Sequence, residues 1–469
     1  MAATNGVNGA NGHHTNGNGT STTPVPATSL LADFVATASP TQLTPALRLK
    51  VKEVLLDYIG VTVGAHQHAE STVPIYEAIL ALQGGPVPNA PSACTVLGMG
   101  APHFLPQYAG LMNATLGHSM DFDDTYAPGT LHAGVTAISA SLAQAELLGE
   151  KASTDLFTLA VAVSYEITCR LGRELGYEAY SRGMHNTSTA GIFGAVAAIA
   201  VLRGLSKETI EMAWVLAGSK AAGSMQYLDN GSWNKRLHPG FAVHDAFMCV
   251  NLAAAGSQSG QGSLSTDNRP GKDWEFLRSS LKPFSACRMT HAFIEIAGDM
   301  HSARSKAGRV KPDDIKEVRL TMSPSNFLLV GDPTPNKIHP TNAIDAQFSA
   351  YYQVANALIY GADTGMEAYQ KLDNGEIAAV SGKISVSTDS SITAFGARLH
   401  ITWADGSKEK KDQPFPLGEE QHPYTKDRVE AKFRSLAVPV YGAEKSKWII
   451  DMVDRLEDFT VQELLQELQ

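Results

Sequence analysis

The densest group of side chains that could perform chemistry lies in one short segment, residues 118–132. Within it stand His118, Asp121, Asp123, Asp124 and His132. Such a set could bind a divalent metal ion, because carboxylates and imidazoles are common ligands. It could equally be a helix end with capping carboxylates and a loop histidine. A third interpretation places Asp121 and Thr125, one helical turn apart, beside a pocket that His132 reaches from the following loop.

A second polar segment, residues 182–189, carries His185 and leads into a predicted helix rich in small residues that begins near Ala190. The first backbone N–H groups of a helix have no partners within it, so this segment could bind an anion. The simpler interpretation is that Asn186 or Ser188 caps the helix.

Two further segments are basic. Lys235, Arg236 and His238 stand just before another predicted helix, and Lys282 and Cys287 lie where the pattern of secondary structure changes. Each segment alone could be a solvated turn or a linker. Together with the histidines, these cations gather at junctions of a chain whose formal net charge is -10. A local cluster of this kind is what a pocket for a di- or tricarboxylate requires.

The elements that must position these side chains are mostly helices. Apolar residues recur with the helical period over residues 45–60, 135–148, 156–171, 190–202, 207–222 and 241–255. From about residue 276 the pattern changes to short alternating strands at 318–322, 383–387 and 397–403. An Asp-Gly turn and a strand at 407–411 follow, which predicts a hairpin. Helices are predicted at 292–303 and 343–360, and residues 426–468 return to the helical period.

We therefore predict a mainly α fold with two domains. A large all-α helical domain comprises residues 29–276 and 419–469, and a smaller α+β lid domain comprises residues 277–418. Residues 1–28 are dominated by Asn-Gly repetition, which cannot bury enough surface to offset its ordering entropy, so a disordered tail is predicted there.

Composition and missing motifs exclude several classes of protein. The excess of 47 acidic over 37 basic residues disfavours binding to nucleic acid or to an anionic membrane. No phosphate-binding glycine loop, GxSxG elbow or HExxH zinc motif is present. The 4 cysteines are widely spaced, which indicates a reducing compartment and no iron–sulfur ligation. Residues 186–202 indicate a buried helix rather than a membrane span, and the start of the chain lacks the features of a targeting signal, so the expected location is cytoplasmic.

Five motifs, in the same order, resemble those of the MmgE/PrpD family. They are DFDDT…LHAG, GMHNTSTAG, KRLHPGFA, KPFSAC…H and the stretch from Pro340 to Tyr351. The resemblance extends from about residue 30 to the end of the chain. It implies a large all-α domain, a smaller α+β lid, a homodimer, and an active site in the cleft between the domains with no metal and no organic cofactor. The family includes 2-methylcitrate dehydratases, cis-aconitate decarboxylases and an iminodisuccinate epimerase.

Carried over motif by motif, the resemblance assigns the family's site to Asp121, Thr125, His132, His185, Lys235 and Lys282. We expect His132, His185, Lys235 and Lys282 to act in catalysis, and Asp121, Thr125, Arg236 and His238 to bind substrate. Lysines that bind non-reacting carboxylates stabilise a neighbouring carbanion, and a histidine can move the proton. The sequence does not assign proton donor and acceptor between the two histidines.

The favoured function is a cofactor-independent lyase that decarboxylates cis-aconitate or an alkylated analogue. The spacing from Thr125 to His132 is similar to that of the fungal decarboxylase, and the alanine-rich stretch of the bacterial dehydratases is absent. By the same resemblance, Cys287 stands at the position where the animal decarboxylases have a histidine. The alternatives are dehydration of 2-methylcitrate or another 2-alkylcitrate, epimerisation alpha to a carboxylate, and a non-catalytic carboxylate-binding protein. The expected partners are a small-molecule polycarboxylate and a second copy of the chain, with no nucleic acid and no membrane.

Overall fold

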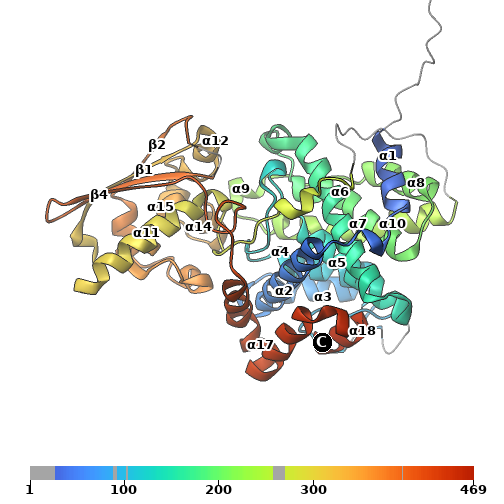
Figure 1. Ribbon diagram of the computed structural model, residues 1–469. Helices are drawn as coiled ribbons and strands as arrows, with labels where there is room; N and C mark the ends of the chain where they lie inside the picture. Colours follow the sequence, from blue (N-terminus) through green and yellow to red (C-terminus); the bar gives the residue numbers. More distant parts are fainter. Residues whose placement is uncertain (1–26, 88–91, 102–103, 257–269, 393–394) are drawn as a thin grey trace, which may run out of the picture.

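The fold has a large helical part and a smaller part in which helices cover one face of a sheet (Figure 1). The structure is a computed structural model that describes residues 27–87, 92–101, 104–256, 270–392 and 395–469. The predicted fold class, mainly α with a smaller α+β part, is confirmed.

The helical part is formed by the first ten α-helices and by the last two, which return to it from the far end of the chain (Figure 1). The helices are α1 (Ala27–Ala36), α2 (Pro45–His68), α3 (Thr72–Gln83), α4 (Pro106–His118), α5 (Gly134–Leu148), α6 (Thr154–Ser181), α7 (Asn186–Arg203), α8 (Lys207–Gly218), α9 (Tyr227–Asn230), α10 (Asn234–Ala254), α17 (Lys426–Asp454) and α18 (Val461–Glu467). Helix α17 packs along α2, so the end of the chain closes the helical part.

Small residues let the central helices approach one another closely. Helix α7 packs against α5, α6 and α10, and a side chain at Gly194 would overlap the hydroxyl of Thr168 on α6. By length and composition α7 is the one helix in the described part of the chain that could cross a membrane, and 89% of it is buried inside the fold. Its apolar character is thus accounted for by its place in the core.

The smaller part contains a four-stranded sheet with strand order β2-β1-β3-β4. The strands are β1 (Ile315–Met322), β2 (Ile384–Thr388), β3 (Ala397–Trp403) and β4 (Lys408–Gln413). Strand β1 pairs with β2 in parallel and with β3 antiparallel, so that Leu320 lies opposite Leu399. The helices are α11 (His291–Arg304), α12 (Pro324–Asn326), α13 (Pro335–Ile338), α14 (Ala343–Gln347), α15 (Ala350–Tyr360) and α16 (Gly375–Ser381). Alternate residues of β1 and β3 are buried on the face that α11 and α15 cover (Figure 1).

Several element boundaries differ from the sequence prediction; helices α2 and α6, for example, extend beyond the predicted ends, to His68 and Ser181. The helix predicted at 343–360 is two helices, because Ser349 starts α15 by accepting a hydrogen bond from the backbone N–H of Tyr352. The helix predicted at 241–255 begins at Asn234 instead. Of the predicted tail, residues 1–26 lie outside the described residues, whereas Ala27 and Thr28 belong to α1 and Thr28 is buried. The domain boundaries at 276/277 and 418/419 stay a prediction.

Candidate active site

A cavity lies at the junction of the helical part and the smaller part. From the helical part and the segment that leaves it, the cavity is lined by the sequence-predicted residues Asp121, Thr125, His132, His185, Lys235 and Lys282. On the other side it is lined mainly by uncharged side chains, which are Cys287, Met289, Leu329, Phe348 and Phe395. A polar cluster facing an apolar wall is typical of a site for a small molecule.

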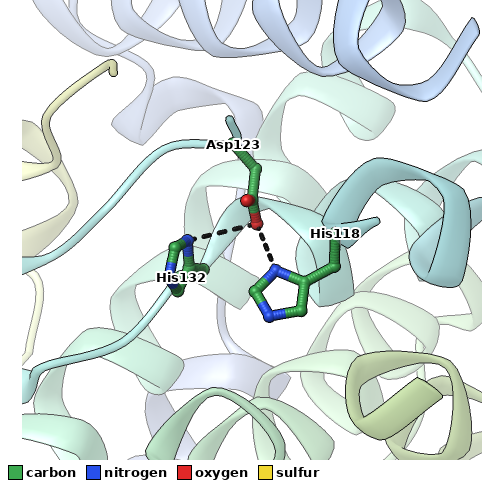
Figure 2. Close-up of side chains that lie close together, drawn as sticks. All are labelled: His118, Asp123 and His132. Atoms are coloured by element: carbon green, nitrogen blue, oxygen red, sulfur yellow. Dashed lines mark hydrogen bonds and ion pairs between the residues drawn. The ribbon is translucent and has the colours of Figure 1, made fainter. Parts of the chain in front are cut away.

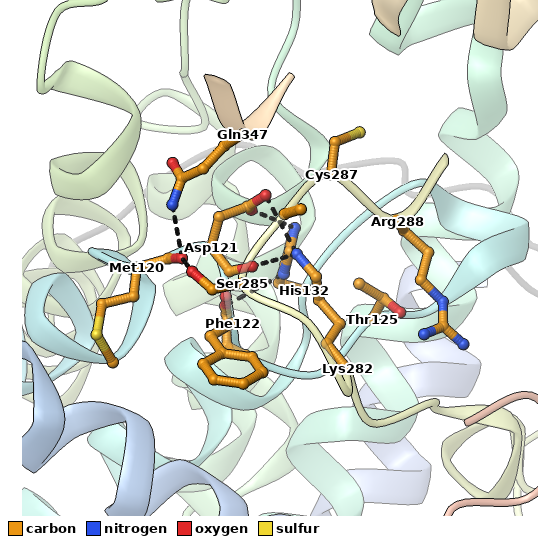
Figure 3. Close-up of polar contacts among 12 residues, drawn as sticks. Met120, Asp121, Phe122, Thr125, His132, Lys282, Ser285, Cys287, Arg288 and Gln347 are labelled. Atoms are coloured by element: carbon orange, nitrogen blue, oxygen red, sulfur yellow. Dashed lines mark hydrogen bonds and ion pairs between the residues drawn. The ribbon is translucent and has the colours of Figure 1, made fainter. Parts of the chain in front are cut away.

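Asp121 lies at the centre of the polar cluster, between two lysines that are distant in sequence. Its Oδ1 is 2.7 Å from the ammonium group of Lys235. Its Oδ2 is 3.1 Å from the ammonium group of Lys282, which Figure 3 shows beside it. Burial acts to raise the pKa of Asp121, but the two ammonium groups outweigh burial and hold this pKa well below its usual value. The carboxylate is therefore ionised and holds both lysines at the cavity.

The backbone around Asp121 is held by side chains from other parts of the fold (Figure 3). The φ angle of Asp121 is 51°, in the left-handed region that is uncommon for residues other than glycine. Three consecutive carbonyl groups accept side-chain hydrogen bonds, Met120 from Ser285 and Gln347, Asp121 from Lys282, and Phe122 from Lys432. These contacts fix the direction of the Asp121 carboxylate without a helix.

The expected helical relation between Asp121 and Thr125 is wrong, although both residues line the cavity. Residues 119–126 form an irregular loop, because the backbone of Thr125 pairs with Ser280 instead of continuing α4. The N–H of each residue donates to the carbonyl of the other at 2.7 Å.

Two histidines of the first segment share one carboxylate oxygen (Figure 2). The Oδ2 atom of Asp123 is 2.7 Å from Nδ1 of His118 and 3.2 Å from Nδ1 of His132. The other ring nitrogen of His118, Nε2, is 3.1 Å from the ammonium group of Lys235. Burial lowers the pKa of His118 to about 3, so its imidazole is neutral at pH 7.

A second histidine pair lies beside the first. The Nδ1 atoms of His185 and His238 are 3.0 Å apart, and the ring of His185 stacks on that of His118 with centroids 5.4 Å apart. Burial, together with the positive charge of Lys235, holds the pKa of His185 well below its usual value. Burial, with Lys235, lowers the pKa of His238 to about 4. Both rings are therefore neutral at pH 7 in this state of the site.

The basic segment does not precede a helix but forms the first turns of α10, which carries Lys235, Arg236 and His238. Successive residues of a helix point about 100° apart, so adjacent side chains face different directions. Lys235 faces the cavity, whereas the guanidinium group of Arg236 donates a hydrogen bond to Oγ of Ser71 at 2.9 Å. Neither Arg236 nor His238 lines the cavity, although His238 contacts His185 directly.

The start of α7 differs from the capping interpretation. His185 is the residue that precedes this helix, and it makes no side-chain cap hydrogen bond. The amide of Asn186 donates to the carbonyls of Gly129 and Gly176, and the hydroxyl of Ser188 donates to the carbonyl of His238. These side chains tie α7 to neighbouring segments rather than capping it.

A metal ion could be held by one group within the described residues, His118, Asp123 and His132, whose ligand atoms lie within 4.8 Å of one another. Two of these atoms are already 2.7 Å apart, which is a hydrogen-bond distance. Because Lys235 can only donate to Nε2 of His118, the ring hydrogen must be on Nδ1, where a metal would have to bind. The donor set therefore fits a hydrogen-bonded arrangement better than a metal site.

Several residues that shape the cavity are not among the predicted site residues. His118 and Asp123 belong to the segment that could have bound a metal ion, and their spacing of five residues is the signal for the pair that they form instead. Gln347 lies inside the last of the five motifs. Lys432, which holds the carbonyl of Phe122, carries no signal in the sequence because it is 310 residues away.

Comparison with known proteins shows that the chain is similar to one protein family over most of its length. Sequence models of the MmgE/PrpD N-terminal domain and the MmgE/PrpD C-terminal domain match residues 29–279 and 284–458. The chain is 25% identical to the "Cis-aconitate decarboxylase-like protein oryM" of Aspergillus oryzae, over 92% of this chain and 94% of that protein. It is 25% identical to the cis-aconitate decarboxylase of Mus musculus, over 89% and 88% of the two chains, and 24% identical to that of Homo sapiens, over 89% of each.

Proposed function

The chain belongs to the MmgE/PrpD family, and from that premise we propose that it is a cofactor-independent lyase that decarboxylates cis-aconitate or an alkylated analogue. The observation that carries the proposal is the placement of Lys235 and Lys282 on either side of Asp121, in a cavity that His132 and His185 also line. The names of the relatives from fungus, mouse and human support this reaction.

Decarboxylation of such an acid requires stabilised negative charge and one proton. The bond between the leaving carboxyl carbon and its neighbour breaks, CO₂ departs, and the electron pair stays behind as an allylic carbanion. The carbanion then takes a proton at the far carbon of the allylic system. Lysines bound to the two remaining carboxylates stabilise the negative charge, an effect worth several kcal/mol in a site closed to water. A histidine that delivers the proton contributes roughly 10²–10⁴-fold.

The charges at the site are balanced before substrate enters. The ammonium groups of Lys235 and Lys282 face the carboxylate of Asp121, and the pKa values of Asp121 and of Asp123 are both held low. Arg288, which also lines the cavity, is paired with Glu419. Asp124 adds no charge at pH 7, because burial and Asp123 raise its pKa to about 8. A trianionic substrate would therefore bring uncompensated negative charge beside neutral imidazoles, which favours their protonation.

We expect polycarboxylate binding to take up protons. Tricarballylate, the saturated analogue of cis-aconitate, suits the measurement because it has neither a double bond nor a hydroxyl group to react. Calorimetric titration at pH 7.5 in phosphate and in Tris, which differ in ionisation enthalpy, gives the number of protons exchanged. Net uptake is expected; no exchange, or net release, would contradict the charge balance described above.

The reaction itself is tested by NMR of the protein with cis-aconitate, citrate and 2-methylcitrate in D₂O. Consumption of cis-aconitate with release of CO₂ and one deuterium in the product supports the proposal. Loss of water from a citrate identifies the dehydratase alternative, and deuterium exchange alone identifies the epimerase alternative. Tricarballylate binding without turnover of any of the three acids would leave a carboxylate-binding protein.

We expect chelation to leave the activity unchanged. Nδ1 of His118 is already hydrogen-bonded to Asp123, so the three candidate metal ligands lack a free set of lone pairs. Dialysis against EDTA followed by a rate measurement tests this. Inactivation that Mg²⁺, Mn²⁺ or Zn²⁺ reverses would show that the carboxylate segment binds a metal.

We propose in addition that the protein forms a homodimer through α10. Phe241, Met248 and Leu252 lie on one stripe of this helix and are 49%, 38% and 43% exposed, which is high for large apolar side chains. Light scattering after gel filtration should give twice the chain mass, and Phe241→Asp should shift the protein toward monomer. Leu49→Asp, at an exposed leucine of α2, serves as the control. A monomeric wild-type protein would refute the dimer.

A further inference from the structure

The carboxylate of Asp123 occupies an unusual place, because a single oxygen serves two imidazoles and the residue does not line the cavity (Figure 2). Asp123 is buried, with an exposed fraction of 2%. Burial acts to raise the pKa of Asp123, but its contacts with the two histidines outweigh burial and hold this pKa well below the usual value. An ionised carboxylate has no hydrogen to donate, so an imidazole nitrogen that hydrogen-bonds to Oδ2 must carry the hydrogen itself.

The contact at the other ring nitrogen of His118, Nε2, locates the hydrogen of this imidazole. The ammonium group of Lys235 can only donate, so Nε2 of His118 is the acceptor at 3.1 Å. A neutral imidazole has one hydrogen, which is then on Nδ1 and is donated to Asp123 at 2.7 Å. His118 is thereby fixed between a cation and an anion.

His132 is oriented by the same oxygen. Its Nδ1 is 3.2 Å from Oδ2 of Asp123, a close ion-pair contact without the alignment of a hydrogen bond, and within the described chain this buried nitrogen has no hydrogen-bond partner. Its Nε2 lies 3.8 Å from Oδ1 of Asp121, on the side where the cavity is. With the hydrogen on Nδ1, Nε2 presents a lone pair toward the position of a substrate.

We propose that Asp123 is a positioning residue that holds His132 in the Nδ1–H tautomer, so that Nε2 of His132 is the atom that transfers the proton. The role in turnover rests on the proposed function, whereas the tautomers do not. In the reaction, Nε2 first takes up a proton, and the resulting imidazolium is stabilised by the adjacent carboxylate. The Nε2–H bond then breaks as the C–H bond of the product forms, and the imidazole returns to its neutral state.

His185 lacks this support. Its Nδ1 faces another imidazole, that of His238, and the neighbours that act on its pKa are Lys235 and imidazoles, all of which disfavour the charged form. A protonated His185 would therefore have no carboxylate beside it, which makes it the less suitable proton donor of the two.

The test compares Asp123→Asn with Asp124→Asn at pH 7. An asparagine at 123 carries no negative charge, so whichever way its amide is turned, no carboxylate remains beside His132 to stabilise its imidazolium. The neighbouring Asp124 is a matched control, since it is equally buried, outside the cavity lining and already neutral at this pH. We expect kcat for cis-aconitate to fall at least about 10²-fold in D123N, with tricarballylate affinity within about threefold of wild type, and both within about threefold in D124N.

The pH dependence of kcat adds a readout that a purely structural role would not change. Without the carboxylate, the charged form of the His132 imidazole is less stable. The part of the kcat–pH profile that reflects protonation of this imidazole should therefore move to lower pH in D123N and stay in place in D124N. Normal kcat in D123N, an equal loss in both variants, or a loss confined to binding would each overturn the proposal.

A measurement on the wild-type protein tests the tautomers directly. Its result does not depend on whether D123N folds or on whether the protein turns over substrate. Long-range ¹H–¹⁵N spectra of histidine-labelled protein distinguish the two neutral tautomers, and His118→Gln and His132→Gln assign the signals. Nδ1–H signals for both residues are expected. An Nε2–H signal for His132 would refute the role of Asp123, whatever the tautomer of His118 and even if the protein is an active decarboxylase.

Discussion

Replacing His132 or His185 by glutamine should lower kcat by two or more decades while KM changes little. Glutamine keeps much of the size and polarity of histidine, so the cavity and the bound carboxylates should remain. What is lost is a ring that can accept and release a proton in the site, a contribution of roughly 10²–10⁴-fold. Steady-state kinetics with cis-aconitate measure the effect, which should appear in kcat because proton transfer occurs only during turnover.

The stereochemistry of deuterium incorporation separates the two histidines. If His132 delivers the proton, the residual product of H132Q formed in D₂O should lose its stereospecific label, whereas that of H185Q should keep it. His66→Gln is the control, because His66 is also a partly buried histidine with a pKa lowered by burial, and it contacts the carbonyl of Leu97 away from the cavity. Folded H132Q and H185Q proteins with normal turnover would remove these residues from the mechanism.

The strands of the smaller part were predictable because their signals are local. The alternation over residues 397–403 coincides with strand β3, Ala397–Trp403, and the Asp405-Gly406 turn joins it to β4 as predicted. Buried and exposed residues alternate along β3, and a tight turn requires the positive φ that Gly406 has. In this hairpin the residues that produce the local sequence pattern are the same residues that the strand and the turn physically require.

The start of α10 was missed because its local signal is misleading. Pro239 lacks the N–H that would bond to the carbonyl of Lys235, and Pro-Gly favours a turn, so a break was predicted. Tertiary packing outweighs that cost: Gly240 has no side chain to keep α10 away from Leu111 and Thr115 of α4. This close approach brings Lys235 to His118 at the end of α4.

For the candidate site, the motifs identified which residues line the cavity, but not how they face one another. The direction of the Arg236 side chain depends on its position around the axis of α10. That position could not be predicted, because the predicted helix began only at residue 241. The hydrogen bond from Gln347 to the carbonyl of Met120 joins residues 227 positions apart, across the two parts of the fold. Contacts at such separation are set by the packing of whole domains, which a single sequence does not encode locally.

Replacing Lys235 by alanine should weaken tricarballylate binding by about 2–4 kcal/mol, roughly 30- to 900-fold in Kd. Lys235 is 6% exposed, so a carboxylate bound to it would be largely removed from water, where a charge-assisted contact is strong. Turnover should fall as well, because the same cation stabilises the developing carbanion. Calorimetry with tricarballylate measures the binding loss. Arg236→Ala is the informative comparison: the basic motif predicts a similar loss, whereas the contact of Arg236 with Ser71 predicts a change below about threefold.

A double mutant then separates substrate binding from neutralisation of Asp121. Lys235 lies 2.7 Å from Asp121, so its removal also leaves that buried carboxylate with less compensation. If this were the whole effect, adding Asp121→Asn to Lys235→Ala would restore tricarballylate affinity, because no uncompensated carboxylate would remain to repel the ligand. If Lys235 binds the ligand directly, the double mutant should stay weak, since the cation is still missing. Restoration to within about threefold of wild type would make Lys235 a counter-ion of Asp121 and leave Lys282 as the anchor for the substrate carboxylate.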